Sequence, residues 1–150
     1  MKEAYVSYEV AKLLKEKGFK ESTQFVWYEH FPSPNAVHNS EIGKPKRDYF
    51  YWEKEGERNS PWANNSPIPS YISGEVYSCP THQMACAWLR EKHHIYANPI
   101  RQGNYDDYSD YYTWIVASNG TIHRNQSVAD KLSYEDAVEA ALKYSLENLI

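Results

Sequence analysis

Aromatic side chains, more than aliphatic ones, must build the core of this chain. Its 150 residues include 14 Tyr, 5 Trp and 4 Phe, whereas Leu, Ile, Val and Phe together number only 27. Such a low aliphatic content is typical of disordered chains, but disordered chains are also poor in aromatic residues. Each buried ring removes about 150–250 Å² of surface from water. The composition therefore predicts a folded protein whose core is rich in rings, many of them half-buried tyrosines.

The size and charge of the chain exclude several classes of protein. A length of 150 residues suits one domain, so we expect a single domain over 1–150. The net charge of -4 argues against a broadly basic surface that binds nucleic acid or membrane. No apolar run approaches about 18 residues, and the N-terminal segment is charged throughout, so we expect neither a membrane span nor a signal peptide. The sequence predicts a cytoplasmic protein.

Periodic apolar residues and capping signals predict three helices. They are expected from Ser7 to Gly18, from about Cys79 to about His93, and from Ser133 through Leu149. Ser7 and Ser133 are good N-cap residues because a side-chain oxygen there accepts a backbone N–H of the first turn. Gly18 is a typical stop signal, and Pro80 suits a first helical turn.

Alternating or continuous β-formers predict the strands. They are expected at residues 24–28, 48–53, 95–100 and 111–117, with a short return strand at 121–124. The return strand would follow a tight turn at Asn119-Gly120. Proline, glycine and asparagine interrupt every pattern between residues 54 and 78, so we expect a long irregular loop there.

The order of these elements, α-β-β-α-β-β-(β)-α, predicts the α+β class. We expect an antiparallel sheet of about 4–5 strands with three helices, because short turns between successive strands favour antiparallel pairing. The segment Leu13–Lys17 resembles Trp88–Lys92, at an offset of 75 residues. A duplicated α-β-β unit is therefore an alternative origin for the element order.

One side of the second expected helix carries candidate metal ligands. Cys79, His82 and Cys86 would gather there, away from the apolar side of the helix. Zinc takes thiolate and imidazole ligands in a tetrahedron, and ligands four residues apart on a helix can share an ion. One straight helix cannot surround an ion, so a site would need ligands from elsewhere. A metal site is kept as an alternative to a buried cysteine and surface histidines, and we expect no cofactor.

A basic and aromatic stretch precedes and enters the second strand. It contains Lys46, Arg47, Tyr49 and Tyr51, a mixture that single-strand nucleic-acid binders use for phosphate contacts and base stacking. Acidic residues at 53, 55 and 57 follow at once and oppose phosphate binding. The sequence therefore favours an ordinary two-faced strand, with a weak single-strand binder as the alternative.

A tyrosine- and aspartate-rich stretch lies between the third and fourth expected strands. It consists of Tyr105, Asp106, Asp107, Tyr108, Asp110 and Tyr111. Its spacing does not match a calcium-binding loop. Tyrosines beside small and polar residues are typical of surfaces that bind proteins, and the carboxylates would suit a basic partner. These six residues are our candidate partner-binding surface, and a solvated hairpin loop is the alternative.

Signatures of catalysis are scarce. The chain contains no GxSxG, Walker A or GxGxxG motif, and no pair of carboxylates stands out. Cys79 and Cys86 could each pair with a histidine, and a helix N-terminus would lower the thiol pKa of Cys79. A metal- or thiol-dependent enzyme that uses the helix face of Cys79, His82 and Cys86 is therefore an alternative. Whether the chain is an enzyme stays open at this point, and the sequence favours a non-enzyme with no catalytic residues assigned.

Three blocks of the sequence resemble one family. They are residues 8–19 (YEVAKLLKEKGF), residues 79–91 (CPTHQMACAWLRE) and residues 134–150, which begin with YEDA and end with LENLI. They are similar to small uncharacterised proteins carried by phages, prophages and genomes of Bacteroides-type bacteria. The resemblance implies a compact α+β protein of phage or mobile-element origin, resident in the cytoplasm. It implies no activity, and the family pattern does not require thiols at Cys79 and Cys86.

Most residues of the three blocks are explained by helix caps and apolar packing. His82 and Gln83 are exceptions, because they are polar positions within the second expected helix. They would cap the helix start or bind a neighbouring loop. We therefore expect a small non-enzymatic protein-interaction module, whose partner is a host or phage protein or a second copy of the chain.

Overall fold

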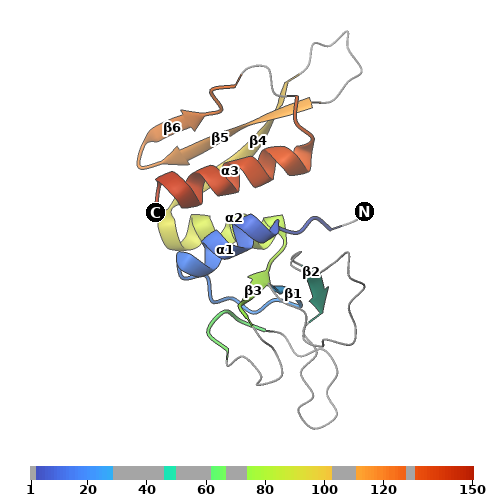
Figure 1. Cartoon of the computed structure of the whole chain (residues 1–150). Coiled ribbons are helices and arrows are strands. Elements are labelled where there is room, and N and C mark those ends of the chain that lie inside the picture. The colour runs from blue at the N-terminus through green and yellow to red at the C-terminus, as the bar shows by residue number, and fades with distance from the viewer. Residues whose placement is uncertain (1–2, 29–45, 50–61, 67–73, 103–110, 128–130) are drawn as a thin grey trace. The chain divides into compact units, whose positions relative to one another are not determined.

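The structure is a computed structural model that describes residues 3–28, 46–49, 62–66, 74–102, 111–127 and 131–150 (Figure 1). The chain divides into two compact units. The N-terminal unit is Ser7–Pro80, and the C-terminal unit is Thr81–Ile150 together with Met1–Val6. Each unit is described by itself, and the expected single domain over 1–150 stays a prediction.

The α+β class is confirmed. The described part of the chain contains, in order, α1 (Tyr8–Glu16), β1 (Phe25–Tyr28), β2 (Lys46–Tyr49), β3 (Val76–Cys79), α2 (His82–His93), β4 (Ile95–Gln102), β5 (Tyr111–Ser118), β6 (Thr121–Arg124) and α3 (Tyr134–Asn148). The described strands form two three-stranded antiparallel sheets, ordered β2-β1-β3 and β4-β5-β6, in place of the one antiparallel sheet of about 4–5 strands that was expected. Each of the first two helices is followed by three strands, but the central strand comes first in one sheet and second in the other, so the α-β-β duplication stays a prediction.

Each of the three described helices begins at a side-chain cap. The hydroxyl oxygens of Ser7, Thr81 and Ser133 accept backbone N–H groups of the first turn at 3.1–3.2 Å. The caps predicted at Ser7 and Ser133 are confirmed. The second helix begins at His82 and not near Cys79, because residues up to Cys79 pair with β1 as strand β3.

The end of α1 closes through a pair of hydrogen bonds around Gly18. The N–H of Gly18 donates to the carbonyl of Lys15 at 3.1 Å, and the N–H of Phe19 donates to the carbonyl of Leu14 at 2.9 Å. Gly18 has a φ of 89°, a left-handed conformation that favours glycine. Leu14 and Phe19 are both fully buried, as expected for the apolar pair of positions that accompanies this motif. The stop predicted at Gly18 is confirmed.

Replacing Gly18 with alanine is expected to destabilise the protein by about 1–2 kcal/mol, the cost of a left-handed conformation with a Cβ. A Cβ at Gly18 would meet no other atom within 4 Å, so the cost is conformational and not a clash. Urea unfolding followed by circular dichroism measures it. Gly18→Asn is the matched control and should lose less, because asparagine tolerates this conformation. Equal losses in the two variants would contradict the explanation.

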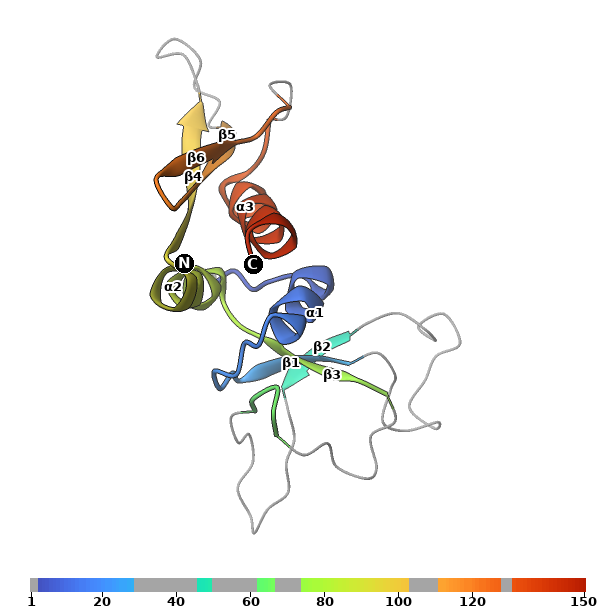
Figure 2. The same cartoon turned by 90° about the vertical axis from the view of Figure 1, so that its left-hand side faces the viewer.

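In the N-terminal unit, the β2-β1-β3 sheet packs on both faces (Figure 2). Val26, Tyr28 and Val76 share one face and form a buried cluster with Trp62. The other face lies towards α1, where the ring of Tyr8 contacts those of Trp27 and Tyr77. All four residues of β3 are buried, so the end of the loop expected at 54–78 is a core strand.

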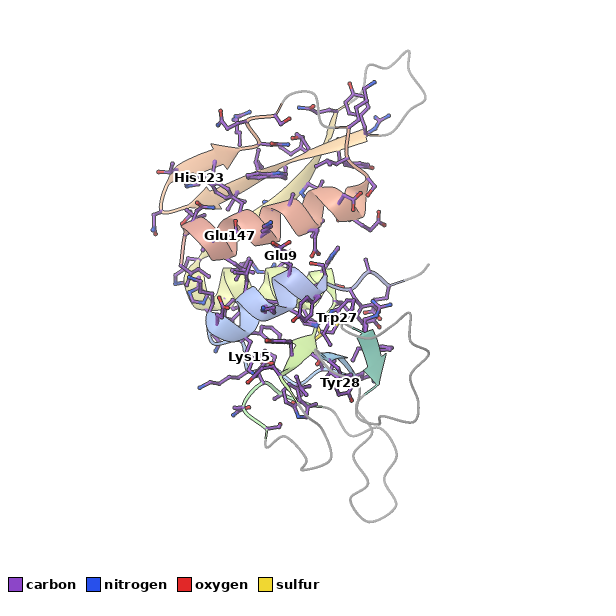
Figure 3. The ribbon with its side chains drawn as sticks, in the orientation of Figure 1. Glu9, Lys15, Trp27, Tyr28, His123 and Glu147 are labelled. Atoms are coloured by element: carbon purple, nitrogen blue, oxygen red, sulfur yellow. The ribbon has the colours of Figure 1, made fainter. Side chains whose placement is uncertain are left out.

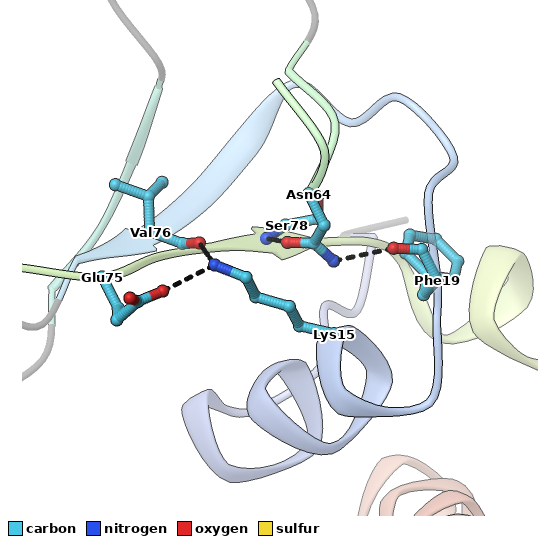
Figure 4. A network of polar contacts seen from close by, with 6 residues as sticks. All are labelled: Lys15, Phe19, Asn64, Glu75, Val76 and Ser78. Carbon is cyan, nitrogen blue, oxygen red and sulfur yellow. Dashed lines mark hydrogen bonds and ion pairs between the residues drawn. The ribbon is translucent and has the colours of Figure 1, made fainter. Parts of the chain in front are cut away.

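A polar network joins the end of α1 to β3 (Figure 4). The side chain of Asn64 donates to the carbonyl of Phe19 at 2.9 Å and accepts the N–H of Ser78 at 2.8 Å. The ammonium of Lys15 binds the carboxylate of Glu75 at 2.7 Å and the carbonyl of Val76 at 3.1 Å. The residues around Asn64 are therefore tied to the sheet, although the sequence predicted only irregular loop there.

In the C-terminal unit, α3 packs against one face of the β4-β5-β6 sheet (Figure 2). The residues between them are buried: Ile95, Ala97, Trp114, Val116, Ala137, Val138, Ala141, Leu142, Ser145 and Leu146. β5 and β6 are joined at Asn119 and Gly120, whose φ angles of 49° and 77° fit the predicted tight turn. The core of this unit is thus formed mainly by α3 on one face of the sheet, and α2 packs against β4 and α3.

Candidate interaction surfaces

Strand alternation and register define a second face of the β4-β5-β6 sheet, opposite α3. We call it the outer sheet face. Its described residues are Tyr96, Asn98, Ile100, Gln102, Tyr111, Thr113, Ile115, Ala117, Ile122 and Arg124. Successive residues of a strand point to opposite faces, so these positions alternate with the buried ones that meet α3.

Large apolar side chains of the outer sheet face are exposed to solvent. Tyr96, Ala117 and Ile122 are register partners across the three strands, so they form one row. The exposed fraction is 48% for Tyr96 and 56% for Ile122. The next row pairs Asn98 with Ile115. The sequence analysis did not single out Tyr96 or Ile122, although apolar residues at consecutive positions of β4 and β5 were a signal that both faces of this sheet are apolar.

Tyr111 is the one residue of the tyrosine- and aspartate-rich stretch that lies within the described residues. It pairs with Gln102 at the start of β5 and belongs to the outer sheet face. The ammonium of Lys131 lies 5.2 Å from the centre of its ring. Tyr112 points the other way and meets the ring of Tyr134 on α3 at 5.4 Å. The remaining candidates, Tyr105, Asp106, Asp107, Tyr108 and Asp110, lie outside the described residues.

The two polar positions of α2 differ in surroundings. His82 is half-buried, and its Nε2 atom lies 2.7 Å from a carboxylate oxygen of Glu139 on α3. Gln83 is exposed. Thr81, not His82, caps the helix. His82 therefore links two helices of the C-terminal unit.

The three candidate metal ligands belong to different elements, Cys79 to β3 and both His82 and Cys86 to α2. Cys79 is the last residue of β3 and is buried, so the prediction that it shares a helix face with His82 and Cys86 is wrong. Burial raises the pKa of the Cys86 thiol to about 11, although the positive charge of Arg90 opposes the shift. Within the described ranges, no group of three or more His, Cys, Asp and Glu side chains is placed to hold a metal ion.

The basic and aromatic stretch begins strand β2. Lys46, Arg47 and Tyr49 lie in β2, and Tyr51 lies outside the described residues. Arg47 is the register partner of Trp27, and its guanidinium carbon lies 5.6 Å from the centre of the Phe25 ring. Arg47 thus joins the aromatic rings that β1 presents on the α1 side of the sheet.

Comparisons with known proteins do not identify a family for this chain. No protein-family model, curated protein or solved structure matches the chain. Among the helices that the structure describes, none is long and apolar enough to cross a bilayer.

Proposed function

We propose that this chain is a small non-enzymatic protein-interaction module that binds a partner protein through the outer sheet face. The observation that carries the proposal is the row of Tyr96, Ala117 and Ile122, in which two large apolar side chains are about half exposed. Exposed apolar surface that is contiguous, and not scattered singly, is typical of a binding site.

The chemistry of the outer sheet face resembles the centre of a protein interface. Among its described residues Arg124 is the one charged side chain, and the others are aromatic, aliphatic or neutral polar. Interface centres are poor in charge and rich in tyrosine, arginine and other large side chains. A partner that lays an apolar patch on this face would bury Tyr96 and Ile122 without desolvating an acidic group there.

The tyrosine- and aspartate-rich stretch extends the proposed surface. Tyr111 places the end of that stretch on the same sheet face as Tyr96. The row of Tyr96, Ala117 and Ile122 lies six residues along β5 from Tyr111, which is about 20 Å of strand. We propose that Asp106, Asp107 and Asp110 contribute to binding, because their carboxylates would suit basic groups of the partner.

The origin and compartment are part of the same proposal. The three sequence blocks resemble proteins of phages and mobile elements of Bacteroides-type bacteria, so we propose a host or phage protein in the cytoplasm as the partner. The raised pKa of Cys86 weighs against the thiol-enzyme alternative, because a protonated thiol is a poor nucleophile.

The experiment compares partner capture by matched variants. The tagged protein is incubated with nuclease-treated lysate of a Bacteroides-type host, and captured proteins are identified by mass spectrometry. We expect one enriched partner, whose affinity falls about tenfold or more in Tyr96→Ser/Ile122→Ser, since buried aromatic anchors dominate such contacts. Met84→Ser is the control, because Met84 is 37% exposed on α2. Retention of the partner by the double variant, or equal loss in the control, contradicts the proposed surface.

Tyr111 tests how far the surface extends. Tyr111→Ala should weaken binding of the same partner by a smaller factor than the double variant, because Tyr111 is half-buried at the end of the face. Isothermal titration calorimetry with the purified partner measures the change. Unaltered affinity would confine the surface to the row of Tyr96 and Ile122.

A further inference from the structure

The end of the outer sheet face beside the Asn119-Gly120 turn carries the row of Tyr96, Ala117 and Ile122. The chain around all three residues is described, because Tyr96 lies within residues 74–102 and the other two lie within residues 111–127. Tyr96 and Ile122 keep 48% and 56% of their surface exposed. This end of the face therefore presents apolar side chains to solvent, and its shape and charge indicate the kind of partner that would cover it.

Ala117 gives the row a low centre between two large side chains. β5 is the central strand, so Ala117 lies between Tyr96 on β4 and Ile122 on β6, with about 5 Å between neighbouring strands. A methyl group fills much less space above β5 than the ring and the branched chain beside it. A rounded apolar element of a partner can therefore approach the central strand closely at this row.

The opposite face of the same sheet already holds an element of that shape. There α3 packs on β4 and β5, and its buried residues include small ones at intervals of four, Ala137, Ala141 and Ser145 (Figure 2). The outer strands of a three-stranded sheet lie about 10 Å apart, which is close to the diameter of one helix. The sheet is therefore wide enough for one helix on each face, and α3 occupies one of the two.

Arg124 adds a single positive charge to this end of the face. It is exposed on β6, two residues after Ile122, and pairs with Ile115. Within the described ranges, none of the ion pairs includes Arg124. His123 lies on the other face of β6, where its Nδ1 atom is 3.0 Å from the hydroxyl oxygen of Tyr144 on α3 (Figure 3). Arg124 is thus a charge that a carboxylate of a partner can neutralise.

This charge argues against a second copy of the chain as the partner. Two copies of the outer sheet face would bring two Arg124 side chains into one interface, with no carboxylate among the described residues of the face. A guanidinium that loses its water without gaining an anion is costly. A partner that carries a carboxylate beside its apolar residues avoids that cost.

Building on the function proposed above, we propose that the partner presents an amphipathic α-helix, whose apolar stripe lies over Ala117 and whose flanking carboxylate binds Arg124. A helix satisfies its own backbone hydrogen bonds, so it can pack on the face of a sheet, whereas an extended strand adds to a sheet edge. The rows of Ile122 and Arg124 lie about 7 Å apart along β6, and one turn of helix advances about 5.4 Å. A carboxylate one turn beyond the apolar residue over Ala117 therefore comes within reach of Arg124.

The test uses phage-displayed peptides of about 18 residues, because a helix of that length spans the eight residues of β5, about 26 Å. Each peptide has the pattern of an amphipathic helix with a fixed apolar stripe, and one position beside the stripe is randomised. Selection on the tagged full chain should enrich aspartate and glutamate at that position. Arg124→Glu should reverse the preference to lysine and arginine, whereas Lys92→Glu, a charge-matched change at an exposed residue of α2, should not.

The peptide selected most often is then labelled with fluorescein and titrated with each variant, and binding is read by fluorescence anisotropy. Ile122→Ser should weaken binding about tenfold or more, because it removes an apolar side chain beside the helix. Ala117→Leu should weaken it about fivefold or more, since a larger side chain lifts the helix from β5. A patch that merely attracts apolar surface would bind equally well or better after Ala117→Leu. Circular dichroism confirms that each variant is folded.

Three results would overturn the proposed helix. The absence of enrichment on folded protein, or equal recovery of acidic, neutral and basic peptides, excludes recognition of an acidic amphipathic helix. Binding that Ala117→Leu or Arg124→Glu leaves unchanged excludes a helix seated over β5. Self-association of the unliganded chain in analytical ultracentrifugation, if Ile122→Ser abolishes it, identifies a second copy as the occupant.

The function proposed for the outer sheet face can stand when the helix fails. If a matched library of extended peptides with central prolines yields the binders instead, and Ile122→Ser abolishes their binding, the face binds protein segments of another shape. The lysate capture with Tyr96→Ser/Ile122→Ser tests the function separately, because it makes no assumption about the shape of the partner.

Discussion

Replacing Phe19 with alanine is expected to lower the free energy of unfolding by about 3–5 kcal/mol. Phe19 is fully buried, and its backbone N–H donates to the carbonyl of Leu14 at the end of α1. The backbone carbonyl of Phe19 also accepts a hydrogen bond from the side chain of Asn64, which joins the end of α1 to the residues around Asn64. A loss of this size is a large share of the 5–15 kcal/mol, in order of magnitude, that stabilises an ordinary domain.

Urea unfolding followed by far-ultraviolet circular dichroism measures the Phe19 effect. Phe19→Leu is the matched control, because it keeps an apolar side chain in the cavity and should lose clearly less stability. Lys20→Ala changes the exposed neighbour and should leave stability within about 0.5 kcal/mol. A loss below about 1 kcal/mol for Phe19→Ala would mean that the site collapses around the missing ring and that the end of α1 does not depend on it.

Local signals predicted the helices well because caps act over a few residues. Ser7 and Ser133 needed only a backbone N–H three residues away, and Gly18 needed only its own backbone conformation. The Asn119-Gly120 turn is local in the same sense. These features depend on short-range chemistry that the sequence displays directly.

Strand β3 was missed because its formation depends on a distant partner. Val76–Cys79 follows a stretch rich in proline and asparagine, and it has no alternating pattern because all four residues are buried. Its hydrogen bonds go to β1, which ends 48 residues before β3 begins. The error over Cys79 followed from this, since a cysteine next to Pro80 suits a helix start equally well when the pairing with β1 is unknown.

Register explains why the row of Tyr96, Ala117 and Ile122 could not be found from the sequence. Tyr96, Ala117 and Ile122 form a row only because β4, β5 and β6 pair in one alignment, and a shift by one residue would reverse their faces. The face of the β2-β1-β3 sheet that lies towards α1 likewise depends on the alignment of Arg47, Trp27 and Tyr77 across three strands. Composition predicted many half-buried tyrosines, but only the pairing shows which of them share a face.

Cys86 is expected to react with iodoacetamide about a hundredfold more slowly at pH 8 in the folded protein than in the unfolded chain. The reactive species is the thiolate. Burial raises the pKa of Cys86 from 9.0 to about 11, so the thiolate fraction at pH 8 falls by about two powers of ten. Mass-spectrometric peptide mapping after timed alkylation gives the rate at Cys86 separately from that at Cys79. The rate in the folded protein should rise about tenfold per pH unit up to about pH 11, until the fold itself is lost.

Arg90 and the alkaline stability of the fold provide two checks on this thiol. The Arg90 charge lowers the pKa of Cys86, so Arg90→Gln should slow alkylation further, whereas Arg124→Gln on the outer sheet face should not.

Between pH 9 and about 11 the unfolded chain releases the Cys86 proton and the folded protein keeps it. The stabilisation from the neutral buried thiol is therefore complete below pH 9 and is lost as the pH rises through 11. Equal alkylation rates in folded and unfolded protein would show that Cys86 is accessible and ionised, and would restore it as a candidate nucleophile.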